Sequence, residues 1–271
     1  MRKRNHSLII GSIMVLFIIA LCILSYIYLP YRIDEMDIRN RFAPPSGSHI
    51  LGTDHFGRDI LSRILVSTRS ALAVSIASVF IGSAAGLAIG SAAALSPAAI
   101  EIAIMRFIDA LMAFPGILSA LMLSAVLGKG IMNASIAIAF FMVPIFARLS
   151  YSMILENRKK GWVKAARSYG ASTPRLVVFH MLPDMLTRLV TQFSSSIGAA
   201  ILTESSLSFL GLGIQPPGAS LGLMLSEAKG YVLLEPYQAL CPGVVLAIAV
   251  LGFSLLGDGI NEMLNRRKGN E

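Results

Sequence analysis

The sequence predicts an all-α protein that crosses a membrane several times, and three observations support this prediction. Hydrophobic residues make up 55% of the 271 residues and charged residues only 14%, against about 25% in an ordinary soluble domain. Mean hydropathy is +0.71. Several apolar runs have the length of about 20 residues at which a helix spans the hydrocarbon core, and no alternating segments of about 10 residues indicate a membrane β-barrel.

Six apolar runs are predicted to be transmembrane helices. Their expected bounds are residues 8–29, 71–95, 102–127, 131–149, 182–201 and 240–256. The first run follows a basic start, but it is longer than the signal-peptide core of about 7–15 residues, so we expect an uncleaved span. Lys and Arg are more frequent in the segments on the side of the N-terminus. By the positive-inside rule, both termini are therefore predicted to lie in the cytoplasm.

The remaining composition excludes several function classes. The positive-inside bias accounts for the net charge of +8 without nucleic-acid binding. Cys22 and Cys241 lie in apolar runs with no disulfide or metal spacing. Gly128-Lys129-Gly130 lacks the upstream glycine and the following Ser or Thr of a P-loop, and neither HExxH nor GxSxG occurs. We therefore expect no catalytic site and no cofactor in this chain.

Glycines recur every four residues in the second predicted span, at Gly82, Gly86 and Gly90. Small residues on one face of a membrane helix allow another helix to approach closely. This spacing therefore predicts a compact helical bundle.

The fifth predicted span is the least apolar and carries polar residues at three- and four-residue spacing. They are Asp184, Arg188, Thr191, Gln192 and Ser195. Because polar side chains within lipid usually face a bundle interior or a water-filled path, we expect these residues, and Glu204 just beyond them, to line a translocation path. The alternatives are an i,i+4 pair of Asp184 with Arg188 near the cytoplasmic interface and an outer-interface position for Glu204. Asp109 in the third span is open to the same two interpretations.

A basic segment, residues 156–175, separates the fourth and fifth predicted spans on the cytoplasmic side. In a chain built mostly for lipid, such a segment predicts contact with a soluble protein. Together with a polar path and no nucleotide-binding motif, it favours the membrane subunit of a transporter driven by a separate ATPase. A secondary transporter, with inverted repeats and charged relays at the midplane, is the competing class. A membrane scaffold for a cytoplasmic partner is the non-transport alternative.

The same segment contains Lys164-Ala165-Ala166 and Gly170, with Leu182-Pro183 following. This pattern resembles the "EAA" loop of ABC-importer permeases. Further blocks at residues 51–63 (LGTDHFGRDILSR), 204–213 (ESSLSFLGLG), 215–217 (QPP) and 256–259 (LGDG) resemble the second permease of the dipeptide/oligopeptide/nickel importer family. There are two departures. Lys164 replaces the usual Glu of the loop, and residues 219–222 (ASLG) lack the Trp that often precedes the glycine.

The resemblance implies a type I importer permease fold and an assembly of several subunits. Residues 1–69 would form the N-terminal transmembrane helix plus an extracytoplasmic segment, and residues 70–265 the permease core with a cytoplasmic coupling loop at 150–181. The partners would be a homologous second permease, two ATP-binding subunits that hold ATP and Mg, and an extracytoplasmic solute-binding protein. The location would be the cytoplasmic membrane of a bacterium or archaeon. Di- or oligopeptides are the first substrate class implied, and nickel or a metal–chelator complex is the second.

Within the loop, the resemblance implies a short coupling helix from about Gly161 to Ser168 that docks on the ATPase. Trp162 would be a buried anchor, Ala165 and Ala166 would permit close approach, and Gly170 would supply the turn that ends the helix. For Trp162 alone, an interfacial membrane anchor is the alternative. The outer segment, residues 31–69, is expected either to cover the outer face and contact the binding protein or to be a solvated loop.

Overall fold

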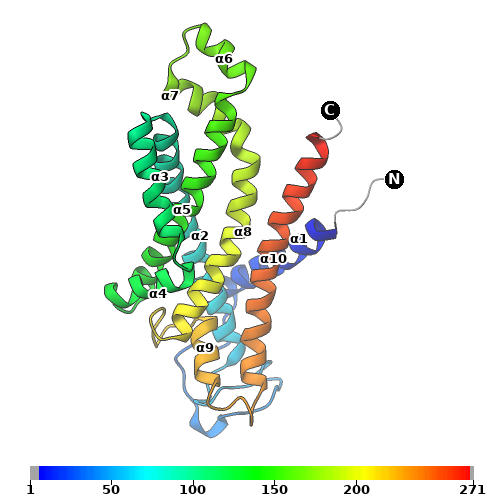
Figure 1. Ribbon diagram of the computed structural model, residues 1–271. Coiled ribbons are helices and arrows are strands. Elements are labelled where there is room, and N and C mark those ends of the chain that lie inside the picture. Colours follow the sequence, from blue (N-terminus) through cyan, green and yellow to red (C-terminus); the bar gives the residue numbers. More distant parts are fainter. Residues whose placement is uncertain (1–5, 269–271) are drawn as a thin grey trace.

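In the computed structural model, which describes residues 6–268, the chain folds as a bundle of long helices with short helices at both ends (Figure 1). The prediction of an all-α protein is confirmed. The long helices are α1 (His6–Ile27), α2 (Ile60–Leu95), α5 (Ile131–Arg158), α8 (Leu182–Phe209) and α10 (Tyr237–Lys268). The shorter ones are η1 (Ile38–Asn40), α3 (Ala98–Met112), α4 (Gly116–Leu127), α6 (Gly161–Ser168), α7 (Thr173–Leu176), η2 (Val177–Met181) and α9 (Leu221–Ala228). The basic start at residues 2–4 lies outside the described residues.

The apolar helices match the predicted spans only in part. Among residues 6–268, α1, α2, α5 and α10 are long and apolar enough to cross a membrane, and α3 with α4 would make a fifth span. The predicted third span is two helices that meet at 90°, because Pro115 disfavours helical backbone in the residue before it and α3 ends at Met112. The predicted fifth span forms α8, which is less apolar. The count of six spans stays a prediction.

The helices also extend beyond the predicted apolar runs. Helix α2 begins at Ile60, eleven residues before the predicted start of the second span. The carboxylate of Asp59 accepts a hydrogen bond from the backbone N–H of Ser62 at 2.8 Å, which is the interaction of a helix N-cap. The predicted outer segment, residues 31–69, is therefore irregular only as far as Asp59.

The glycines of α2 form its contact with α5. A Cβ atom at Gly82, Gly86 or Gly90 would lie between 2.1 and 2.6 Å from atoms of α5, so a side chain at any of them would force the two helices apart. The prediction that this stripe brings another helix close is confirmed, and the partner is α5. This pair carries much of the buried core, including Val79, Met142 and Phe146.

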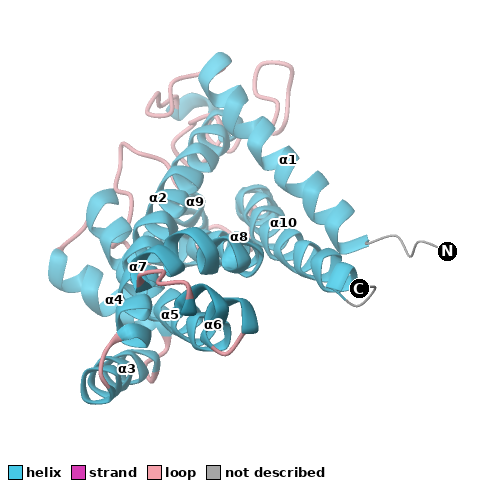
Figure 2. Ribbon diagram, turned by 90° about the horizontal axis from the view of Figure 1, so that it is seen from above, coloured by secondary structure: helices cyan, strands magenta, loops and turns pink. Residues whose placement is uncertain are grey.

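The two ends of the bundle carry different structures. Helices α6 and α7 lie beyond the ends of α5 and α8, whereas residues 28–59 and α9 lie at the opposite end (Figure 1). Helix α1 packs on α10 at one side of the bundle, and both ends of the described chain lie toward the α6 end (Figure 2). This arrangement agrees with termini on the same side as the coupling loop, although the orientation in a membrane stays a prediction.

Candidate functional site

The predicted coupling helix is present as α6, with the bounds Gly161–Ser168. Its end is a Schellman motif, in which the N–H of Gly170 bonds to the carbonyl of Arg167 at 2.9 Å and the N–H of Ala171 bonds to that of Ala166 at 3.1 Å. Gly170 has φ +83°, a left-handed conformation in which glycine has no steric penalty. The expectation that Gly170 forms the terminating turn is confirmed.

Helix α6 is attached to the bundle through Val163, which is fully buried and belongs to the main hydrophobic core. Trp162, the anchor suggested by sequence, is 38% exposed and stacks on His180 with ring centroids 6.4 Å apart. Lys164 and Ala165 are also exposed, whereas Ala166 is half-buried. One face of α6 is thus fixed by a residue that sequence reasoning missed. The opposite face, with Trp162, is open to a partner.

Leu182-Pro183 connects this loop to α8 through a widened turn. Residues Val177–Met181 form the π-helix η2, and the N–H of Leu182 bonds back to the carbonyl of Val177. Proline has no N–H, and its ring clashes with the carbonyl four residues earlier. A π-turn before Pro183 removes that clash without ending the helix. The Leu-Pro element therefore sets the direction in which the loop enters α8.

Two ion pairs join the base of the loop to α8. Lys160 Nζ lies 2.6 Å from Asp184 Oδ2, and Arg188 donates to both carboxylate oxygens of Glu156 at 2.6 and 3.2 Å. The sequence-based alternative was a pair between Asp184 and Arg188 on one helix. Arg188 bonds to α5 and Asp184 to the residue just before α6, and Asp184 also attracts Arg188 electrostatically. These contacts hold the end of α5, where the loop begins, against the start of α8, where the loop ends.

Thr191, Gln192 and Ser195 are all half-buried on α8. Ser195 packs against α10, because a Cβ at Gly257 would lie 3.2 Å from the Ser195 nitrogen. Thr191 Oγ1 donates to the carbonyl of Thr187 at 3.1 Å, and Gln192 Nε2 lies 3.1 Å from Ser196 Oγ. These polar groups are satisfied within the helix, and a role in lining a path stays a prediction.

Glu204 lies near the end of α8 that is farther from α6, which we call the outer end, and it is fully buried. Ser208 Oγ donates to its carboxylate at 2.7 Å, Ser205 Oγ lies 3.5 Å away, and Ser220 also contacts it. Ser220 in turn caps α9 by accepting from the N–H of Leu223 at 3.1 Å. Glu204 therefore joins the end of α8 to the start of α9 through serine hydroxyls.

The outer end holds a buried network of charges that the sequence analysis did not identify. Asp54 Oδ2 lies 2.7 Å from Arg58 Nε and 2.5 Å from the Arg63 guanidinium, and both arginines reach Glu227 on α9 at 2.8 Å. The signal available in the sequence was the spacing of Asp54, Arg58 and Arg63 in one block. This network fastens the outer segment to α9.

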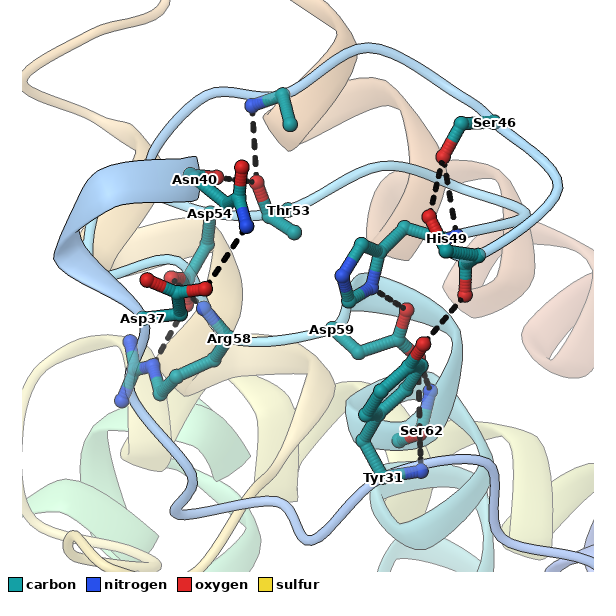
Figure 3. Close-up of polar contacts among 12 residues, drawn as sticks. Tyr31, Asp37, Asn40, Ser46, His49, Thr53, Asp54, Arg58, Asp59 and Ser62 are labelled. Atoms are coloured by element: carbon teal, nitrogen blue, oxygen red, sulfur yellow. Dashed lines mark hydrogen bonds and ion pairs between the residues drawn. The ribbon is translucent and has the colours of Figure 1, made fainter.

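A second group of contacts holds the same segment against the start of α2 (Figure 3). His49 Nδ1 lies 3.0 Å from Asp59 Oδ1, and Tyr31 stacks on the His49 ring with centroids 4.5 Å apart. The backbone N–H of Tyr31 donates to Ser62 Oγ at 3.1 Å. Residues 31–59, which we call the cap, are therefore held in place at several points, while most of residues 32–48 are exposed to solvent.

Electrostatics in this cap favour ionised Asp54 and neutral His55. Burial alone would raise the pKa of Asp54, but the guanidinium groups of Arg58 and Arg63, with two backbone N–H donors, hold it below its ordinary value. Burial lowers the pKa of His55, which the carboxylates of Asp54 and Glu227 only partly offset. In the part of the chain that is described, no three His, Cys, Asp or Glu side chains are grouped as metal ligands.

Comparison with known proteins gives a consistent result. Residues 56–270 match the family model "Binding-protein-dependent transport system inner membrane component". The chain is 39% identical over 263 residues to the glutathione transport system permease protein GsiD of Pectobacterium atrosepticum, which covers 97% of this chain and 87% of that protein. It is 40% identical over 264 residues to the GsiD protein of Shigella flexneri, with the same coverage.

Solved structures show the same fold. An inward-facing form of the MetNI methionine ABC transporter superposes with a TM-score of 0.60 at 20% identity, over 72% of this chain and 94% of the other. A second crystal form of that transporter gives a TM-score of 0.61 over 73% and 94%. At this identity the likeness concerns the fold alone.

Proposed function

The chain belongs to the inner-membrane components of binding-protein-dependent transport systems, within the dipeptide/oligopeptide/nickel family, and we propose that it forms half of the path by which an ABC importer takes up small peptides. It is a transport permease and not an enzyme. Its curated relatives are bacterial proteins, for which the inner membrane is the typical location. ATP and Mg would be bound by separate subunits, and a homologous permease would complete the path.

The observation that carries this proposal is the open face of α6. The helix projects beyond the bundle (Figure 1), is fixed on one side by buried Val163, and exposes Trp162, Lys164 and Ala165 on the other. A short helix held rigidly at its base transmits force better than a flexible loop. ATP-driven closure of the ATPase dimer would move α6, and α5 and α8 would follow because the loop is braced to both.

The opposite end would receive the solute-binding protein. The cap of residues 31–59 is tied to α9 and to the start of α2, so it offers a fixed surface at the outer end of the bundle. Release of solute from the docked protein into the open path would precede ATP hydrolysis, which resets the permeases to face inward.

The proposed substrate follows from the relatives. Two of them are named as glutathione transport permeases, and glutathione is a tripeptide. We expect a strain that lacks only this gene to lose uptake of labelled glutathione or of a labelled dipeptide, and to regain it when the gene is restored. Uptake of radioactive nickel, measured in parallel, should be unchanged. Loss of nickel uptake alone would contradict the peptide proposal.

The coupling step has its own test at Gly170. A bulky β-branched residue such as Val is strained at φ +83°, whereas Asn tolerates this region of backbone conformation. No atom lies within 4 Å of a Cβ added at Gly170, so steric contact does not confuse the comparison. Gly170→Val should lose most uptake at unchanged membrane abundance, and Gly170→Asn should keep it. Equal uptake by the two variants would contradict a coupling role for this turn.

A further inference from the structure

Helix α5 carries a polar stripe on its exposed side. Arg148, Ser152 and Glu156 follow one another at four-residue spacing, and all three are exposed. Residues at this spacing share one face of a helix. We call them the α5 stripe. Ala147, Ser150 and Ile154 on other faces are buried, so the stripe lies on a side of α5 that the bundle leaves open.

Charged residues from the two neighbouring helices flank the stripe. Arg148 forms an ion pair with Asp109 of α3, and Glu156 forms one with Arg188 of α8. Figure 2 shows α5 between α3 and α8. The stripe, Asp109 and Arg188 therefore come from three neighbouring helices, and we call these five residues the charged wall. The signs alternate along this wall, and its side chains are 40–55% exposed.

This wall lies partly at membrane depth. Asp109 is about 10 Å along α3 from residue 102, where the third span is predicted to begin, and its partner Arg148 lies at the predicted cytoplasmic end of the fourth span, at 1.5 Å per residue. Charged side chains in contact with lipid at such depth are costly, and those found there face a bundle interior or a water-filled cavity. By contrast, exposed Phe107, with exposed Ala103 and Ala110 at helical spacing, gives another face of α3 an apolar surface suited to lipid. The wall therefore faces water and α3 separates it from lipid.

We propose that the α5 stripe, with Asp109 and Arg188, is the cytoplasmic half of the solute path and binds peptides through their two charged ends. The inference rests on the proposed function and adds its residues and substrate chemistry. In the absence of solute, each cation is neutralised by its partner. The carboxylate end of a zwitterion can replace Asp109 beside Arg148, while its ammonium end pairs with Asp109 or Glu156. A path of alternating charge offers a partner to both the ammonium and the carboxylate groups of a peptide.

The first test asks whether the wall faces water. Asp109→Cys and Phe107→Cys, which lie at nearly the same depth on α3, are compared in a Cys22→Ser, Cys241→Ser background, using inside-out vesicles from cells that produce the whole transporter. A thiol reacts as its thiolate, which is suppressed in apolar surroundings. A charged methanethiosulfonate should therefore label the Asp109→Cys site on the order of tenfold faster than the Phe107→Cys site. Equal rates at the two sites would overturn the proposal.

The second test asks what the charges recognise. Uptake of a free tripeptide is compared with that of its C-terminally amidated and N-terminally acetylated forms. Arg148→Gln should reduce the preference for the free carboxylate about fivefold, as for one partly solvated ion pair, and Asp109→Asn should reduce the preference for the free ammonium end. A merely structural pair would lower uptake of all three peptides by the same factor, which would overturn the proposal.

The two tests separate this inference from the proposed function. If wild-type cells import none of the peptides, the peptide proposal fails, while the labelling rates still decide whether the wall faces water. If wild-type cells import peptides and the Asp109→Cys site stays unlabelled, the proposed function stands and the charged wall is not its path.

Discussion

The two ends of the bundle are both held by ion pairs, but the pairs differ in their exposure to solvent. At the outer end the side chains of Asp54, Arg58, Arg63 and Glu227 are only 2–16% exposed. At the α6 end the side chains of Glu156, Lys160, Asp184 and Arg188 are 32–49% exposed. The same chemistry is therefore used in two different dielectric surroundings.

This difference in exposure predicts that the outer end is more rigid than the α6 end. Removing one member of a buried network leaves an uncompensated charge and is strongly destabilising. Exposed pairs contribute little to stability and can break and re-form at small cost. The outer end is thus suited to be a fixed platform, and the α6 end is suited to exchange contacts during the proposed transport cycle.

The largest expected effect follows from breaking the outer network. Arg63→Met keeps the length and most of the volume of the side chain but leaves Asp54 and Glu227 with one guanidinium instead of two. We expect a loss of about 3 kcal/mol, seen as a fall of about 10 °C in the thermal midpoint of the purified permease in detergent. Arg32→Ala is the control, because Arg32 pairs with Asp34 on the open surface and its removal should leave the midpoint unchanged. Similar thermal midpoints for the two variants would contradict a stabilising role for the outer network.

Acid should loosen the outer end without loosening the α6 end in the same way. The pKa of His55 is lowered, so the folded cap favours the neutral ring, and this stabilisation is complete above the ordinary pKa of about 6.5 and is lost as pH falls through the lower folded value. The pKa of Asp54 is also lowered. Its contribution is present above about pH 3.9 and is lost only below that.

The loss of the His55 contribution can be measured by hydrogen exchange between about pH 7.5 and about pH 5, corrected for the intrinsic pH dependence of exchange. Protection of residues 31–59 should fall relative to that of α6. His55→Gln, which cannot become charged, should remove the change. An unchanged ratio in the wild type, or the same ratio change in the variant, would show that His55 does not control the cap.

Features that depend on local sequence were predictable. The bounds of α6 were expected from the resemblance of its segment to a known loop, and its terminating turn at Gly170 could be predicted because a Schellman motif involves only residues close in the chain. The glycine stripe of α2 was also sufficient to predict a close helix contact, because small residues have few other uses at regular spacing in a membrane helix.

Features that depend on which helices become neighbours were not predictable. Val163 looks ordinary in the sequence, and only the packed core shows it as the anchor of α6. Arg188 has an acidic residue four positions before it, yet it bonds to Glu156, which is 32 positions away. Glu204 looked like a path residue because a membrane carboxylate is unusual, and its contact with Ser220 at the start of α9 became visible only in three dimensions.

The smallest expected effect tests the exposed end of the comparison. A double-mutant cycle of Glu156→Ala and Arg188→Ala should give a coupling energy of about 0.5 kcal/mol, because both side chains are half exposed and water competes for the pair. The readout is the thermal midpoint, since both residues also belong to the proposed path and uptake would mix the two roles. A coupling as large as the loss in Arg63→Met would mean that the α6 end is locked as firmly as the outer end. In that case movement of α6 would have to be transmitted by rigid rotation of α5 and α8 together, and not by exchange of the contacts between them.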